Sequence, residues 1–320
     1  MEPTRTISRR ALLRLAAVGG AAAALVACSD ERPLASGQPT EAPASSTTST
    51  PPGSPTAAPP TPAPTPKPVP PAGVIARPLL PGTAWETPFL VTHSGRAGST
   101  MMFLGGAHGN EPGGWLAADE VATWTPGAGS IVVVPRANIL ATRLLVRTTD
   151  ELGDLNRLYP GSADGLPMER MAAAILDLAR EFGADLLIDM HESWGFFAER
   201  VQNGTAFLGQ TVTASTGPEF ETIVPALLRI ANPRIEVTRD LLVTRDQFPL
   251  ANASPNASPT STPPSTASLG RGSSSLAIGR FIPTMTPVLV EMGQQEQPVD
   301  RRIALHLEVA RAALELRGMA

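Results

Sequence analysis

The chain has 320 residues, of which 42% are hydrophobic and 17% are charged, so part of it can form a folded domain of ordinary size. Its formal net charge is −4, and the region expected to fold contains no basic cluster, which argues against a nucleic acid as partner. The single cysteine excludes a disulfide bond within the chain.

Residues 1–27 combine four arginines with a short apolar run. The arginines precede an uncharged stretch from Leu15 to Ala27, which is too short to cross a bilayer as a helix. This pattern predicts an export signal peptide. The paired Arg9 and Arg10 resemble a twin-arginine signal, but paired arginines also occur in ordinary secretory signals, so both export routes stay open.

The segment that follows predicts a lipid anchor and a tether. The sequence Leu25-Val26-Ala27-Cys28 resembles the bacterial lipoprotein cleavage box, in which the cysteine is lipidated and becomes the first residue. Two acyl chains give stable membrane attachment, so we expect an extracytoplasmic, membrane-anchored bacterial lipoprotein. Residues 28–73 are dominated by Pro, Ser, Thr and Ala, which predicts a disordered tether that holds a domain off the membrane.

Residues 74–320 fit one domain, in which apolar runs alternate with helical patterns. Strands are predicted at 89–92, 101–104, 131–134, 185–190 and 287–290, and helices at 112–124, 168–182, 220–230 and 298–317. The alternation argues for an α/β fold with a mostly parallel or mixed central sheet flanked by helices. Pro225 interrupts the third helical pattern, and residues 251–275 return to a Ser, Thr, Pro and Asn composition that predicts a low-complexity insertion.

Polar side chains suited to metal chemistry follow three of the predicted strands. His108 and Glu111 come after 101–104, His191 after 185–190 and Glu291 after 287–290. In α/β sheets the ligand crevice lies at the carboxyl ends of the strands, so these side chains are expected to meet there. Catalytic zinc usually takes three protein ligands from His and Glu or Asp.

Each of these residues also has an alternative structural interpretation. Glu111 could cap the helix that starts at Pro112, His191 could be a satisfied polar residue, and Glu291 could pair with an arginine. His93 and His306 lack the setting of a ligand, and His306 is interpreted as structural. Trp194 fits the lining of a pocket and the packing of a core equally well.

Four short motifs occur in the order found in the zinc carboxypeptidase superfamily. They are Gly105–Glu111 (GGAHGNE), Asp154–Arg157 (DLNR), Asp189–His191 (DMH) and Val290–Gly293 (VEMG). The chain most resembles the succinylglutamate desuccinylase and aspartoacylase branch, over residues 98–294. The resemblance implies a single catalytic domain with a zinc carboxypeptidase-like (phosphorylase/hydrolase-like) fold.

The resemblance also implies a role for each motif residue. One zinc ion per chain is expected on the metal ligands His108, Glu111 and His191, and Glu291 is expected to act as the general base. Arg147, with Arg143 and Arg136 as competitors, would stabilise the oxyanion. Asn156 and Arg157 match the dipeptide that holds the substrate carboxylate.

These expectations describe a zinc-dependent hydrolase that cleaves an amide bond of a small carboxylate-bearing substrate, with an N-acyl amino acid as the leading class. The first alternative is a carboxypeptidase that acts on short peptides or cell-wall peptides. It is weakened because the only tyrosine, Tyr159, lies far from the late loop where such enzymes often place one. The second alternative is a non-catalytic binding lipoprotein. The acyl group, the amino acid and the oligomeric state are left open.

Overall fold

The computed structural model describes residues 68–200, 204–245 and 273–320, which all lie in one compact unit, Pro64–Ala320. The predicted signal peptide, Cys28, the tether up to residue 67 and residues 251–272 of the predicted insertion lie outside the described residues. Within the described ranges, no helix is both long and apolar enough to cross a membrane.

The described elements alternate between strands and helices, as the sequence predicts. The strands are β1 (Gly73–Leu79), β2 (Thr87–His93), β3 (Thr100–Gly105), β4 (Ser130–Val134), β5 (Leu186–Ser193), β6 (Gly195–Phe196), β7 (Phe207–Gly209), β8 (Thr211–Ala214) and β9 (Thr286–Gly293). The α-helices are α1 (Pro112–Val121), α2 (Ile139–Leu144), α3 (Pro167–Phe182), α4 (Ile223–Ala231) and α5 (Val299–Leu316).

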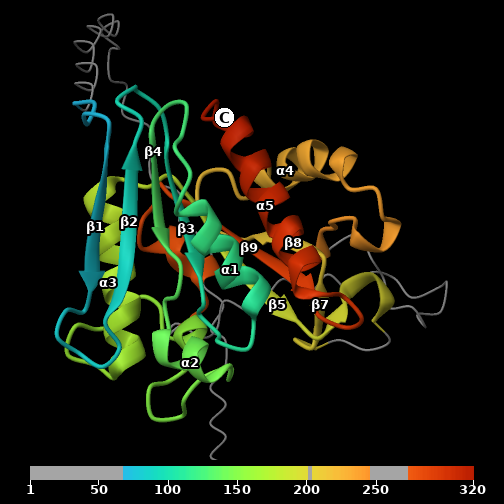
Figure 1. The fold of residues 1–320 in the computed structure, drawn as a ribbon, viewed down its shortest axis with the longest axis horizontal. Helices are drawn as coiled ribbons and strands as arrows, with labels where there is room; N and C mark the ends of the chain where they lie inside the picture. The colour runs from blue at the N-terminus through green and yellow to red at the C-terminus, as the bar shows by residue number, and fades with distance from the viewer. Residues whose placement is uncertain (1–67, 201–203, 246–272) are drawn as a thin grey trace, which may run out of the picture. The chain divides into compact units, whose positions relative to one another are not determined.

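A 7-stranded mixed sheet in the order β1-β2-β4-β3-β5-β9-β8 forms the centre of the domain (Figure 1). Its middle strands β4, β3, β5 and β9 are parallel, whereas β1, β2 and β8 pair in the antiparallel direction. The predicted α/β fold with a mostly parallel or mixed sheet is therefore confirmed. Because the parallel strands end at the same edge, β3, β5 and β9 bring their carboxyl ends together.

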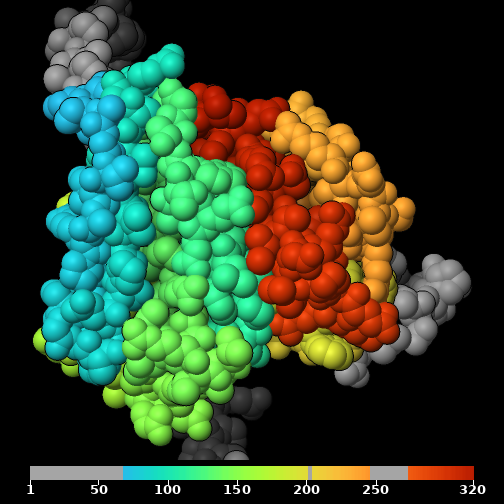
Figure 2. Space-filling model, viewed as in Figure 1, coloured from blue at the N-terminus to red at the C-terminus, as the bar shows by residue number. Residues whose placement is uncertain are grey.

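Helices cover both faces of the sheet and create two apolar cores. One core packs α1, α4 and α5 against Met101, Ile188 and Val290, and α1 and α5 lie side by side on this face (Figures 1 and 2). The other core packs α3 against side chains of the opposite face, including Met102 and Leu187. Alternate residues of β5 thus point into different cores, as the two-residue period of a strand requires. A parallel sheet buried on both faces explains its near-continuous apolar runs.

Two predicted boundaries differ from the structure in ways that affect the site. Strands β5 and β9 run three residues beyond their predicted ends, because the ladder continues through His191 opposite Glu291 and Ser193 opposite Gly293. The polar residues His191 and Glu291 therefore lie inside strands and not after them. Backbone pairing does not depend on side-chain polarity, so an apolar run underestimates the length of such a strand.

Other predicted boundaries shift for local reasons. The helix predicted at 112–124 ends at Val121, since Thr123 and Trp124 donate to carbonyls three residues back and tighten the last turn. Pro225 does not interrupt α4, because it lies in the first turn, where a missing N–H has no cost. The insertion was predicted to extend to residue 275, but Ser273 bridges to Tyr159 and Ser275 is buried, so the folded chain has resumed by Ser273.

We expect a Leu187→Ala substitution to lower the free energy of unfolding by about 2–5 kcal/mol, because Leu187 is fully buried in the core below α3. Its side chain lies on the same face of β5 as His191 but four residues before it, and it carries no polar atom, so metal binding should persist in the folded fraction. Chemical denaturation of the wild-type and variant proteins measures the difference. A loss below about 1 kcal/mol would show that the core collapses around the missing side chain.

Candidate metal centre

Two segments at the carboxyl edge of the sheet supply the predicted ligands. His108 and Glu111 lie in the loop between β3 and α1, and His191 lies in β5 beside β3. Two glycines shape the loop. Gly106 has φ of +67°, a conformation that L side chains rarely adopt, and a Cβ at Gly109 would overlap the carbonyl of Ala141 at α2. The glycine-rich sequence thus lets the loop turn back towards β5.

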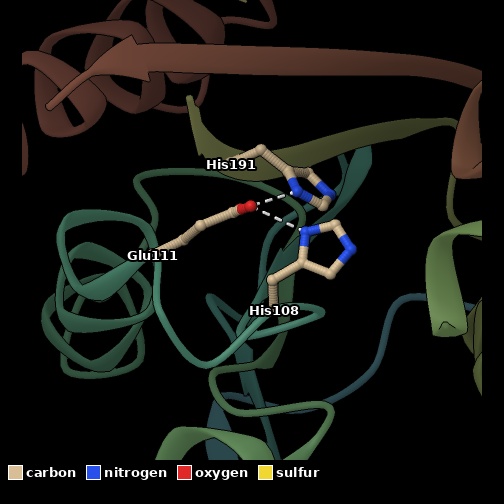
Figure 3. Close-up of side chains that lie close together, drawn as sticks. All are labelled: His108, Glu111 and His191. Atoms are coloured by element: carbon tan, nitrogen blue, oxygen red, sulfur yellow. Dashed lines mark hydrogen bonds and ion pairs between the residues drawn. The ribbon is translucent and has the colours of Figure 1, made fainter. Parts of the chain in front are cut away.

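The three side chains point towards one another (Figure 3). The Glu111 carboxylate lies between the imidazoles, with Oε1 2.7 Å from His108 Nδ1 and Oε2 2.8 Å from His191 Nδ1. All three side chains are almost fully buried. Glu111 occupies the N-cap position of α1, but its side chain makes no capping hydrogen bond. The predicted ligands are therefore brought together, and helix capping does not explain Glu111.

A second carboxylate lies at the outer nitrogen of each imidazole. His108 Nε2 is 3.0 Å from Asp154 Oδ1, and His191 Nε2 is 3.0 Å from Asp189 Oδ2. Histidines that bind metals commonly donate their other N–H to a carboxylate, which fixes the ring and makes it a better ligand. Both aspartates lie within the sequence motifs, but the motifs alone assign them no role; their signal in the sequence is an acid two residues before His191 and one at the start of the DLNR motif.

The electrostatics of the cluster favour positive charge at its centre. Burial alone would lower the pKa of His191, but Asp189 and Glu111 outweigh it and hold that pKa well above its ordinary value. Burial alone would also lower the pKa of His108. Glu111 and Asp154 outweigh burial, so this pKa is raised as well. Burial would raise the pKa of Glu111, but the two imidazoles outweigh it and hold that pKa well below its usual range.

These residues fit a metal ion. One ligand atom from each of His108, Glu111 and His191 lies within 4.8 Å of the other two, so the cluster could hold one ion. Two imidazoles and one carboxylate are a donor set of catalytic zinc sites. An ion at this position would take the place of the protons on Nδ1 of the two histidines. The Nε2–H groups of the histidines would still donate hydrogen bonds to Asp154 and Asp189.

Glu291 lies beside this cluster. It is opposite His191 in the parallel pair β5–β9, so both side chains leave the sheet on the same face. Burial is the main cause that raises the pKa of Glu291 to about 7, and the charge of Glu111 adds to it. Arg245 Nη2 is 4.0 Å from Glu291 Oε1. Arg245 is a cation that sequence reasoning missed, because it lies beside the polar insertion and outside every motif.

The residues predicted to stabilise the oxyanion and to bind the substrate differ in exposure. Arg147 is half exposed, with Nη1 3.6 Å from Glu111 Oε1 and Nη2 3.2 Å from Asp154 Oδ2. Its competitor Arg136 instead pairs with Asp119 and stacks on Trp115. Asn156 is buried, and its Oδ1 accepts a hydrogen bond from Ser275 N, whereas Arg157 is exposed and donates to the Asn156 carbonyl.

The two remaining histidines are buried outside the ligand cluster, whereas Trp194 is exposed. His306 is fully buried in α5, and burial lowers its pKa to about 3, so its ring is neutral at physiological pH. His93 ends β2, and its Nδ1 lies 2.7 Å from Ser130 Oγ, away from the cluster. Trp194 is 57% exposed, so the core-packing interpretation is wrong for this residue.

We expect Asp189→Asn to weaken zinc binding by about 10–100-fold, as is typical when an outer partner of a ligand histidine is changed. The amide keeps the size of the side chain but removes the charge that His191 Nε2 faces. Competition with a chromogenic chelator measures the affinity. Asp177→Asn, on the exposed surface of α3, is the matched control and should bind zinc like the wild type. Equal affinities in both variants would contradict the role of Asp189.

The central mixed sheet with its flanking helices matches the zinc carboxypeptidase-like fold of the solved structures below. Within this class, residues 97–194 match the model of the succinylglutamate desuccinylase/aspartoacylase catalytic domain. The match contains His108, Glu111, the DLNR motif and His191, and it ends before Glu291. No curated protein matches the chain in sequence.

Solved structures with the same fold share few identical residues with this chain. The tripeptide-bound cell shape determinant Csd4 of Helicobacter pylori is 17% identical, with 70% of this chain and 52% of that chain covered and a TM-score of 0.55. A succinylglutamate desuccinylase of Silicibacter sp. is 21% identical, with 79% and 69% covered and a TM-score of 0.50. The product-bound ectoine utilization protein EutE of Ruegeria pomeroyi is 20% identical, with 79% and 69% covered and a TM-score of 0.50. The chain thus spans about half the length of Csd4.

Proposed function

We propose that this protein is a zinc-dependent hydrolase that cleaves the amide bond of a small carboxylate-bearing substrate, of the N-acyl amino acid type. The observation that carries the proposal is the buried cluster of His108, Glu111 and His191 with Glu291 beside it. The match of residues 97–194 to the desuccinylase and aspartoacylase model supports an amide-cleaving activity. A zinc ion on the three ligands would supply an activated water and polarise the scissile carbonyl.

The side chains of this chain would then transfer the proton, stabilise the developing negative charge and bind the substrate. The Glu291 carboxylate would accept the proton of the attacking water and pass it to the leaving nitrogen, a task suited to a carboxylate whose pKa is raised to about 7. The Arg147 guanidinium, half exposed beside Glu111, would stabilise negative charge on the carbonyl oxygen. The exposed Arg157 would bind the substrate carboxylate, with Asn156 holding the turn that carries it.

A peptidase activity is the second candidate, and one observation favours it. Csd4, whose fold this chain shares, has been solved with a tripeptide and with mDAP, and it is described as a D,L-carboxypeptidase. A carboxypeptidase that acts on short or cell-wall peptides would use the same metal ligands, the same glutamate and a carboxylate-binding arginine. We rank it second because the match of residues 97–194 is to the desuccinylase and aspartoacylase domain.

We also propose an extracytoplasmic location. The signal-like residues 1–27 and the lipidation sequence at Cys28 support a lipoprotein that is anchored to the membrane by its first mature residue. Residues 28–73 would then tether the hydrolase domain. Metabolic labelling with a fatty acid tests this proposal, since Cys28→Ser should abolish incorporation, whereas labelling of the variant would contradict it.

The function is tested with the full chain, loaded with zinc and incubated with a mixture of N-acyl amino acids and short peptides, with release followed by mass spectrometry. Free amino acids released from acylated substrates by the wild type, and not by Glu291→Gln, would support the deacylase. Trimming of peptides would promote the carboxypeptidase. Silence on both classes despite bound zinc would favour a non-catalytic binding lipoprotein.

A further inference from the structure

A buried ion pair lies on the face of the sheet opposite to the side chain of His191. Glu192 follows His191 in β5, so its side chain points to the side of α1 and α5. There its Oε2 lies 2.8 Å from Nη1 of Arg302, in the first turn of α5. The side chain of Glu192 is 0% exposed and that of Arg302 is 10% exposed. Two opposite charges are therefore enclosed directly behind the third ligand.

The ion pair is joined to the loop that carries the other ligands. Glu192 Oε2 accepts a hydrogen bond from Gln294 Nε2 at 3.0 Å, and the same Nε2 donates to the Asn110 carbonyl at 2.8 Å. The backbone N–H of Glu192 donates to Glu111 Oε2 at 3.0 Å. Three elements, β5, the end of β9 and the ligand loop, thus meet at Glu192.

The start of α1 is shaped to admit this pair. A Cβ at Gly113 would overlap Glu192 Oε1 and would lie 2.9 Å from Arg302 Cβ. Gly113 follows Glu111 by two residues, so any displacement of Glu192 or Arg302 acts on the helix turn next to the metal ligand. A side chain at position 113 would push against this pair and would likewise displace the helix turn next to Glu111.

Stability alone does not explain why two charges are buried here. Desolvation opposes the attraction within a buried ion pair, and apolar replacement of such pairs is often neutral or stabilising. We propose that Glu192 and Arg302 are positioning residues, which hold Glu111 and His191 in register and thereby raise the metal affinity of the site. The inference rests on the metal centre of the proposed function, and its test separates the two.

The test compares zinc dissociation constants of the full chain, measured by chelator competition, with the thermal unfolding of the metal-free proteins. Arg302→Met should weaken zinc binding by about 10–100-fold, and Arg302→Lys should recover most of the affinity. The double variant Glu192→Leu with Arg302→Met removes both charges and should fold, but should still bind zinc weakly. The control is Arg301→Met, which removes the ion pair to Asp240 from the same helix turn and should leave the affinity within about two-fold of the wild type.

The outcomes distinguish failure of the inference from failure of the proposed function. A wild-type chain that binds no zinc would overturn the metal centre itself. A wild-type chain that binds zinc, with the double variant at wild-type affinity, would overturn the positioning role alone. The positioning role would also be overturned if Arg301→Met and Arg302→Met lost equal zinc affinity and equal thermal stability. The loss of affinity would then follow from destabilising α5 and not from the pair of Glu192 and Arg302.

Discussion

A His191→Ala protein is expected to lose bound zinc and hydrolytic activity together. His191 is 1% exposed, and its ring lies between the carboxylates of Glu111 and Asp189. Its removal leaves only His108 and Glu111 as ligands, and it leaves Glu111 and Asp189 without the imidazole between them. The zinc affinity should fall by more than about 100-fold, beyond the effect of changing an outer partner. Metal analysis after dialysis and an activity assay on a confirmed substrate measure both losses.

The matched control is His93→Ala. This histidine is also almost fully buried and also lies in a strand of the sheet, but it contacts Ser130 and lies away from the cluster. It should keep a full equivalent of zinc in the folded protein. Full zinc occupancy and full activity in His191→Ala would show that the third ligand is wrongly assigned.

A Glu291→Gln protein should keep its zinc and lose most of its turnover. The substitution preserves size but removes the carboxylate that we propose accepts the proton, so kcat should fall by about 10²–10⁴-fold, the usual contribution of a general base. Glu291 is not among the three ligands, so metal content should stay at the wild-type level. Steady-state kinetics and metal analysis of the same sample provide the test.

Glu296→Gln serves as the control for that substitution. Glu296 lies five residues further along the chain, and its side chain is 79% exposed. It should retain wild-type kcat and zinc content. If Glu291→Gln lost zinc, the carboxylate would be a ligand; if its kcat were unchanged, another group would have to accept the proton.

The elements that were predicted correctly are those in which buried positions carry apolar side chains and exposed positions carry polar ones. Strands β3 and β4 and helix α3 were predicted within a residue or two at each end, because a buried strand and an amphipathic helix leave apolar patterns. Edge strand β1 was missed because most of its residues are exposed, so burial imposes no regular apolar pattern on it. The short strands β7 and β8 carry too few residues for a pattern.

The meeting of His108, Glu111 and His191 was predictable because a glycine-rich turn, a histidine and a glutamate lie together in the sequence, and strand order then fixes where His191 falls. The supporting contacts were not predictable. The pair of Glu192 and Arg302 spans 110 positions and depends on how α5 packs on the sheet. Likewise, the contact between His108 and Asp154 depends on the path of the chain between α2 and α3. Contacts of this kind leave no periodic signal in the sequence.

We propose that one zinc ion on His108, Glu111 and His191 makes this chain a hydrolase. The most direct measurement is to strip the full chain with a chelator and to follow amide hydrolysis while zinc is returned in fractions of an equivalent. We expect activity to be absent at the start, to rise in proportion to added zinc and to stop rising at one ion per chain. Full activity in the metal-free protein, or zinc uptake without any dependence on these three residues, would contradict the account.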